Sequence, residues 1–208
     1  ALAFAGVLDL ADAIKLVQRR GELMQKACEL KPGAMAAILG LDHMVIEEIS
    51  RATGTYVSNI NTEEQIVISG DRLAIARALD LAISRGARKA IPLRVGGGFH
   101  SALMEPAKSG LIDTVNQLDF HNPNIPIIAN CTGEPLSQGE EIKREIISQI
   151  SSCVQWKRSM DYMLNAGISK FVEIGPGKTL TSMVKRINRS AETLNVSDLD
   201  TIQQLSRN

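Results

Sequence analysis

The sequence has few of the features that mark several large classes of protein. Aromatic residues make up only 3% of the 208 residues, and 23 Lys and Arg residues are balanced by 23 Asp and Glu residues. Nucleic-acid binders usually carry a basic excess and, for single strands, aromatic platforms on which bases stack. We therefore expect neither a nucleic acid nor an anionic membrane surface as a partner.

Long apolar runs are also missing. No stretch approaches the ~20 apolar residues that a bilayer-spanning helix needs, and residues 1–10 lack the basic start and cleavage pattern of a signal peptide. The three cysteines, Cys28, Cys131 and Cys153, are odd in number and widely spaced, which is typical of reduced thiols. Neither they nor the histidines show metal-ligand spacing. We expect a cytoplasmic protein without a metal site.

The central part of the chain alternates strand-like and helix-like segments. Strands are predicted at 34–39, 55–60, 64–69 and 89–95, and helices at 42–52 and 71–86. This βαββαβ order is that of a ferredoxin-like unit. We therefore predict a ferredoxin-like small domain over 33–96, inserted into an α/β large domain formed by 1–32 and 97–208. RNA binding is disfavoured because strands such as 65–69 lack aromatic residues.

The large domain contains two further strand signals. The run 125–129 is typical of a buried strand, and 170–174 is followed by the turn Gly175-Pro176-Gly177 and a predicted helix over 179–187. A glycine turn before a helix can cradle a phosphate at the helix N-terminus. It can equally be a plain turn, and both interpretations stay open.

A histidine follows a run of glycines at a predicted strand-to-helix junction. Gly96 to Gly98 come after the last strand of the small domain and precede Phe99 and His100, and a helix is predicted from about 102 to 118. Glycine permits close approach of a ligand or of another chain segment. His100 is therefore either a functional base facing a cleft or a structural side chain beside a turn.

An arginine lies on the apolar face of the first predicted helix. The residues that define this face are Leu10, Ala13, Ile14, Val17, Met24, Ala27 and Cys28. Arg20 falls on it, three residues after Val17, whereas Arg19 points elsewhere. A buried guanidinium needs an anionic partner, and its fork suits a carboxylate. That partner is either a ligand or an internal Asp or Glu.

Four short motifs occur in one order around the small domain. They are Arg20-Gly21-Glu22-Leu23-Met24, Gly98-Phe99-His100-Ser101-Ala102-Leu103-Met104, Val154-Gln155-Trp156 and Gly175-Pro176-Gly177-Lys178-Thr179-Leu180. With them, essentially the whole chain resembles the malonyl-CoA:acyl carrier protein transacylase family of bacterial fatty-acid synthesis. The resemblance implies an α/β-hydrolase-like large domain that carries the ferredoxin-like domain, with the active site between them.

The resemblance also implies roles for single residues. His100 would be the general base, and Arg20 would bind the malonyl carboxylate. Gln155 would lie at the active site, where the main chain of its segment helps to orient the histidine. Asn61 matches a family position near the bound thioester. Independently of the resemblance, the apolar side chain of Phe99 either helps to keep water away from the substrate or only packs in the core.

The reaction implied for the family is a two-step acyl transfer. Malonyl passes from the thiol of coenzyme A to a serine, and then to the phosphopantetheine thiol of acyl carrier protein. The expected partners are malonyl-CoA and acyl carrier protein. We expect a monomer, and no cofactor, because both thiol carriers are substrates.

One part of the family pattern is missing from these 208 residues. The nucleophilic serine of the family lies in a G-x-S-x-G turn, and no such sequence occurs here. Matching Ala1-Leu2-Ala3 to the family places that serine a few residues upstream of Ala1. We therefore expect the chain to correspond to the C-terminal two thirds of the enzyme. The alternative is a non-catalytic fragment of the same fold that binds coenzyme A or carrier protein.

Overall fold

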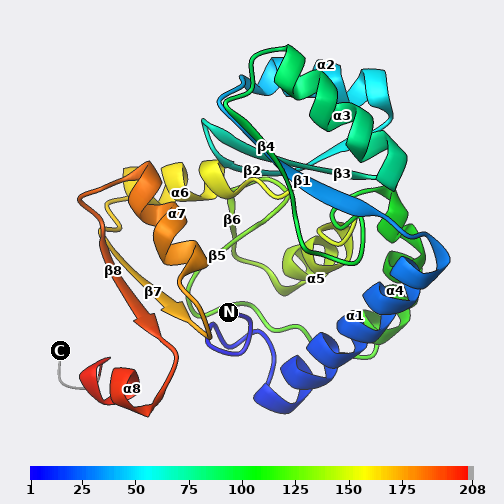
Figure 1. Cartoon of the computed structure of the whole chain (residues 1–208). Coiled ribbons are helices and arrows are strands. Elements are labelled where there is room, and N and C mark those ends of the chain that lie inside the picture. The colour runs from blue at the N-terminus through cyan, green and yellow to red at the C-terminus, as the bar shows by residue number, and fades with distance from the viewer. Residues whose placement is uncertain (206–208) are drawn as a thin grey trace. The chain divides into compact units, whose positions relative to one another are not determined.

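A computed structural model describes residues 1–205 and shows an α/β protein with open sheets, as predicted (Figure 1). The chain separates into two compact units, residues 1–159 and a second unit that starts at Met160.

The predicted βαββαβ segment is confirmed within the first unit. Its elements are β1 (Ala34–Leu39), α2 (His43–Thr53), β2 (Tyr56–Thr62), β3 (Gln65–Gly70), α3 (Arg72–Ser84) and β4 (Lys89–Pro92). The strands form one antiparallel sheet in the order β2-β3-β1-β4, which is the ferredoxin-like order, and α2 and α3 lie together on one face of it (Figure 1). The domain boundaries at 33 and 96 stay a prediction.

Local sequence explains where these helices begin and end. Asp42 and Asp71 cap α2 and α3, since each carboxylate accepts a hydrogen bond from a main-chain N–H of the first turn at 2.8 Å. Gly54 ends α2 in the left-handed conformation, at φ 75°. Between helices and sheet lies a fully buried core that includes Ile38, Ile46, Ile49, Ile66 and Ile68.

A second core of the first unit forms around α1 (Leu10–Leu30). This helix packs against η1 (Ala102–Met104) and α4 (Glu105–Asn116), and α4 in turn packs against α5 (Gly139–Ser148). The segment predicted as one helix over 102–118 is thus a short 3-10 turn followed by an α-helix. Pro106 lies in the first turn of α4, where a missing N–H costs no helical hydrogen bond.

The buried stripe of α1 differs from the predicted one. Leu10, Ile14 and Val17 are 69%, 59% and 69% exposed, whereas the stripe that faces η1 and α4 consists of Leu16, Leu23 and Ala27. Arg20 comes four residues after Leu16 and three before Leu23, so it lies on this stripe instead. The predicted placement of Arg20 is correct. The predicted face was right at Ala13, Met24, Ala27 and Cys28, which are buried or pack against the core, and wrong at the three exposed residues.

The predicted buried strand over 125–129 is much shorter in the structure. Only β5 (Ile127–Ile128) is a strand, and it pairs with β6 (Pro135–Leu136) in a two-residue antiparallel ladder. Both isoleucines are only half-buried, and Ile125 is 46% exposed. The apolar run is therefore one arm of a small hairpin, not a central strand.

The second unit contains a parallel strand that the sequence did not reveal. α6 (Trp156–Asn165) leads into β7 (Lys170–Ile174), α7 (Thr179–Ile187), β8 (Glu192–Val196) and α8 (Leu199–Leu205), and β8 pairs with β7. The main-chain N–H groups of Leu180 and Thr181 donate to the Glu173 carboxylate at 3.0 and 2.8 Å. These donors are already used, which favours the plain-turn interpretation of Gly175 to Gly177 over a phosphate site.

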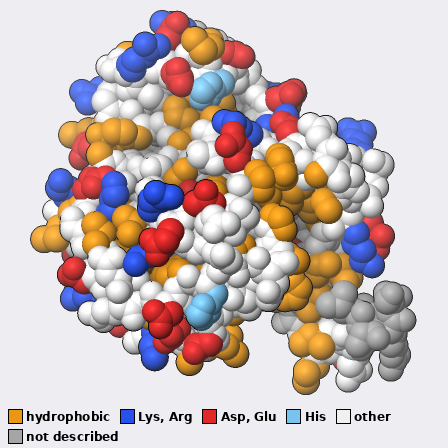
Figure 2. Space-filling model, turned by 180° about the vertical axis from the view of Figure 1, so that it is seen from behind, with side chains coloured by type: hydrophobic (Ala, Val, Ile, Leu, Met, Phe, Trp, Pro, Cys, Tyr) orange, Lys and Arg blue, Asp and Glu red, His pale blue; other side chains and the backbone are white. Residues whose placement is uncertain are grey.

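The surface carries charges of both signs. On the face shown in Figure 2, acidic and basic side chains are intermixed, in keeping with equal numbers of each in the sequence. Within residues 1–205, no helix is long and apolar enough to cross a bilayer.

Candidate functional site

His100 occupies an unusual backbone conformation. Its φ is 55°, and it is the one non-glycine residue with a positive φ in the part of the chain that the structure describes. Residues held in this region cost conformational energy and often mark functional sites, because the surrounding structure must hold them there. The conformation favours the functional interpretation of His100 over the structural one.

Gly33 and Gly97 are needed for close packing of the chain segments next to His100. A Cβ atom on Gly33, at the start of the small domain, would lie 2.6 Å from the main-chain nitrogen of Gly98. A Cβ atom on Gly97 would overlap the side chain of Cys28. The close approach expected at the glycine run is therefore made by the protein itself, and it fixes the loop that carries His100.

The ring of His100 is oriented by a main-chain carbonyl. Its Nδ1 lies 2.9 Å from the carbonyl oxygen of Gln149, directly after α5. A carbonyl oxygen only accepts hydrogen bonds, so the neutral ring carries its proton on Nδ1 and keeps a lone pair on Nε2. This is the form in which a histidine acts as a base.

The resemblance pointed to Gln155 and to the main chain of its segment, and the structure places the orienting carbonyl on Gln149, at the start of that segment. The carbonyl oxygen of Gln155 accepts instead from the N–H and the hydroxyl of Ser159, at 2.9 and 3.0 Å. α5 contained the signal that was needed, because the last carbonyl groups of any helix have no partner inside it. A carbonyl near the end of that helix was thus available for His100.

Burial and a nearby cation keep His100 neutral. Burial lowers the pKa of His100 below its ordinary 6.5, and the positive charge of Arg20 lowers that pKa further. Hydrogen bonds to the main chain of Gln149 and Ser152 oppose this shift. The two residues predicted to act together are thus close enough to interact electrostatically.

Arg20 has no acidic partner in the part of the chain that the structure describes. Among residues 1–205, no side chain forms an ion pair or a hydrogen bond with its guanidinium, and burial lowers its pKa. The neighbouring Arg19 instead pairs with Glu22 at 3.1 Å near the surface. The alternative of an internal salt bridge for Arg20 is therefore not realised in the described structure, and a partly buried cation remains available to an anionic ligand.

Asn61, Gln155 and Phe99 lie on segments connected to His100. The N–H of Ile60 donates to the carbonyl of Val154 at 2.9 Å, and the N–H of Val154 donates to Ser58 at 2.8 Å. Asn61 directly follows Ile60 on β2, and Gln155 directly follows Val154. Gln155 also belongs to the chain segment that starts at Gln149. Phe99, directly before His100, packs against both the α1 core and the sheet.

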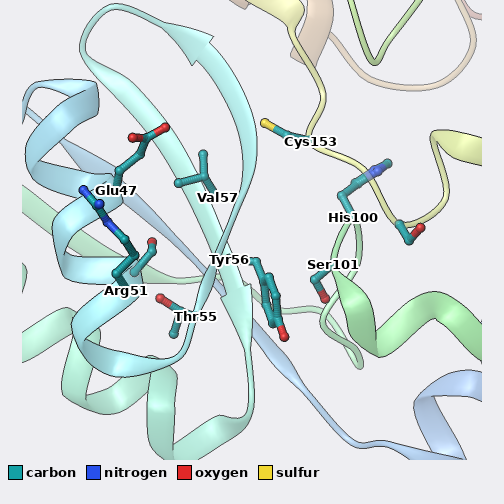
Figure 3. Close-up of a pocket in the computed structure, with 10 residues that line it drawn as sticks. Glu47, Arg51, Thr55, Tyr56, Val57, His100, Ser101 and Cys153 are labelled. Carbon is teal, nitrogen blue, oxygen red and sulfur yellow. The ribbon is translucent and has the colours of Figure 1, made fainter.

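His100 also lines a pocket of about 390 Å³. Figure 3 shows that one wall consists of residues from α2, from β2 and from the turn between them, and that His100, Ser101 and Cys153 line the other. The residues of the first wall are Glu47, Arg51, Thr55, Tyr56 and Val57. The volume falls in the range of small-molecule sites. Of the five predicted site residues, only His100 is among the residues that line this pocket.

The cysteines near the site are not suited to be nucleophiles. Burial raises the pKa of Cys131 to about 12 and that of Cys153 to about 11, and the charge of Glu145 adds to the shift at Cys131. Thiols with such pKa values are protonated at neutral pH and react poorly. In the described residues, no group of three His, Cys, Asp or Glu side chains could hold a metal ion.

The influence of Arg20 on His100 can be measured directly. We expect His100 to titrate below pH 6.5 in an NMR titration of its ring, and its pKa to rise when Arg20 is replaced by glutamine, because a repelling charge is removed. Replacement of Arg19 is the matched control and should leave the midpoint unchanged. A midpoint unaffected by the loss of Arg20 would contradict the electrostatic contact.

Comparison with known proteins identifies the family. The acyl transferase domain family matches residues 1–208. The chain is 38% identical over 208 residues to a malonyl CoA-acyl carrier protein transacylase of Bacillus subtilis, covering 98% of this chain and 66% of the relative. It therefore spans about two thirds of the length of such relatives.

Solved structures agree with the sequence match. A Streptococcus pneumoniae structure described as MCAT is 37% identical, covers 100% of this chain and 69% of its own, and superposes with a TM-score of 0.93. A malonyl-transacylase solved in complex with its type II PKS acyl-carrier protein is 35% identical and covers 100% of this chain and 69% of its own, with a TM-score of 0.92. The chain belongs to the acyl transferase domain family.

Proposed function

We propose that the chain supplies the base and the substrate-carboxylate site of a malonyl-CoA:acyl carrier protein transacylase. The observation that carries this proposal is the combination of a histidine protonated on Nδ1 with a partly buried arginine that has no ion-pair partner among the described residues. The names of the relatives, and the complex of one structural neighbour with an acyl carrier protein, support the substrates. We also propose that the protein is a cytoplasmic monomer.

In the proposed reaction His100 moves a proton twice. Its Nε2 takes the proton of a serine hydroxyl as the serine attacks the malonyl thioester, and the resulting imidazolium returns a proton to the departing thiolate of coenzyme A. The reverse sequence then delivers malonyl to the phosphopantetheine thiol of the carrier protein. The nucleophilic serine belongs to the proposal and is expected upstream of Ala1.

Arg20 would select the acyl group by binding the free carboxylate of malonyl. A fork of N–H donors matches a carboxylate with two parallel hydrogen bonds. Acetyl would leave the guanidinium without an anion, which is costly for a buried charge. Apolar contacts around Phe99 would exclude water that could otherwise hydrolyse the acyl-serine.

Intact-mass measurement after incubation with malonyl-CoA tests the proposal. We expect one malonyl group on the protein when it is expressed with the residues that precede Ala1 in its natural coding sequence, because those residues would supply the serine. The 208-residue chain alone should gain no malonyl group. Binding of coenzyme A by the longer protein without acylation would instead favour the non-catalytic alternative.

A further inference from the structure

The carbonyl that orients His100 lies at the end of a helix. The N–H of Gln149 donates to the carbonyl of Glu145 at 2.9 Å, so Gln149 continues the hydrogen-bond ladder of α5. Carbonyl groups in the last turn have no partner in their helix and carry partial negative charge. The Gln149 carbonyl is therefore a strong acceptor for Nδ1–H, provided that the segment after it is held still.

Asn130 contacts both ends of that segment, residues 149–155. Its side-chain Nδ2 donates to Oε1 of Gln149 at 3.0 Å, and its carbonyl oxygen accepts from the N–H of Gln155 at 2.7 Å. One residue thus connects the start and the end of the segment. The side chain of Asn130 is half-buried, which limits competition from water for the bond to Gln149.

Glu145 holds Asn130 in place from the same helix. Its Oε1 accepts from the N–H groups of Asn130 and Cys131 at 2.7 and 3.0 Å. Glu145 comes four residues before Gln149 and therefore lies on the same side of the helix. The turn at 130–131 is bound to the helix whose end supplies the carbonyl, which closes a ring of hydrogen bonds around Gln149.

We propose that Asn130, supported by Glu145, is a positioning residue for His100. It holds the Gln149 carbonyl against Nδ1 and so keeps the proton on Nδ1 and the lone pair on Nε2. Asn130 is placed to act through Gln149 rather than on the substrate. The catalytic consequence depends on the function proposed above, whereas the effect on the ring of His100 does not.

The proposal is tested with the Asn130→Ala variant in two measurements. Nitrogen NMR shifts report which ring atom of His100 carries the proton, and we expect the Nδ1–H form to give way to a mixture of the two tautomers. The rate of malonyl loading, measured with the residues upstream of Ala1 present, should fall on the order of tenfold to hundredfold, because misplacing a base slows the chemical step. The KM for malonyl-CoA should change little.

Asn122→Ala is the matched control. Oδ1 of Asn122 accepts from the N–H of Gly139 at 2.9 Å, so this asparagine supports the start of α5. In the described structure it forms no hydrogen bond with residues 149–155. The control should leave both the tautomer of His100 and the loading rate close to those of the parent. If both variants lost the Nδ1–H tautomer and the loading rate to the same extent, Asn130 would only stabilise the helix in general, and the proposal would be overturned.

The remaining outcomes separate this inference from the proposed function. An unchanged tautomer in Asn130→Ala overturns the positioning role, whatever the rate does. A changed tautomer in a protein whose parent never accepts malonyl upholds the positioning role and rejects the proposed function. A circular dichroism melt of each variant identifies unfolding, in which case Asn130→Ser, which retains a short hydrogen-bonding side chain, is measured in the same way.

Discussion

Replacement of His100 by alanine is expected to slow malonyl loading by roughly 10²- to 10⁴-fold, the usual contribution of a positioned general base. The variant keeps the loop but has no group that can take the serine proton or return it to the leaving thiolate. The rate is best followed by single-turnover quenching and mass measurement, because a single turnover separates acylation from the transfer to carrier protein.

His121→Ala provides the matched control for that experiment. His121 is exposed and makes its hydrogen bond to Val7 through its main-chain N–H, which the substitution preserves. Its loss should leave the loading rate nearly unchanged. Loading by the His100 variant at the parent rate would show that another group acts as the base.

Replacement of Arg20 by alanine is expected to remove the preference for malonyl over acetyl. Leaving one partner of a buried charge pair unmatched costs about 2–5 kcal/mol, on the order of a factor of tens to thousands in kcat/KM for malonyl-CoA. The acetyl group has no carboxylate and loses no such contact. The selectivity, measured with the two thioesters in competition, should therefore fall by most of that factor.

Arg19→Ala is the corresponding control for selectivity. Arg19 makes an exposed pair with Glu22, and such pairs contribute little free energy. The control variant should retain the preference for malonyl. A parent protein that loads acetyl as readily as malonyl would contradict the proposed role of Arg20 before any variant is made.

The ferredoxin-like segment was predictable because several local signals agree there. Asp42 and Asp71 mark helix starts, Gly54 marks a helix end, and the strand 65–70 has an apolar centre, Ile66 to Ile68, that is buried on both faces. When caps, turns and periodicity give the same answer, sequence reasoning works at the level of whole elements. The bounds then differ by only a few residues.

Three features were not predicted correctly: the buried face of α1, the carbonyl that orients His100, and the strand β8. The stripe of α1 depends on which side meets α4, and a helix with two apolar sides does not encode that choice. Gln149 acts through its main chain, so its side-chain type carries no signal. β8 reads Glu-Thr-Leu-Asn-Val and is stabilised by its partner β7 rather than by its own composition.

The left-handed backbone at His100 has a consequence for engineering. Positions with positive φ are attractive targets for improving heat resistance, because glycine adopts this conformation without the steric penalty of about 1–2 kcal/mol that other residues incur. A search on that basis would select position 100 before any other non-glycine residue of the described chain. The resulting protein would lose the base that we propose, so a substitution that raises stability at this residue is expected to lower activity.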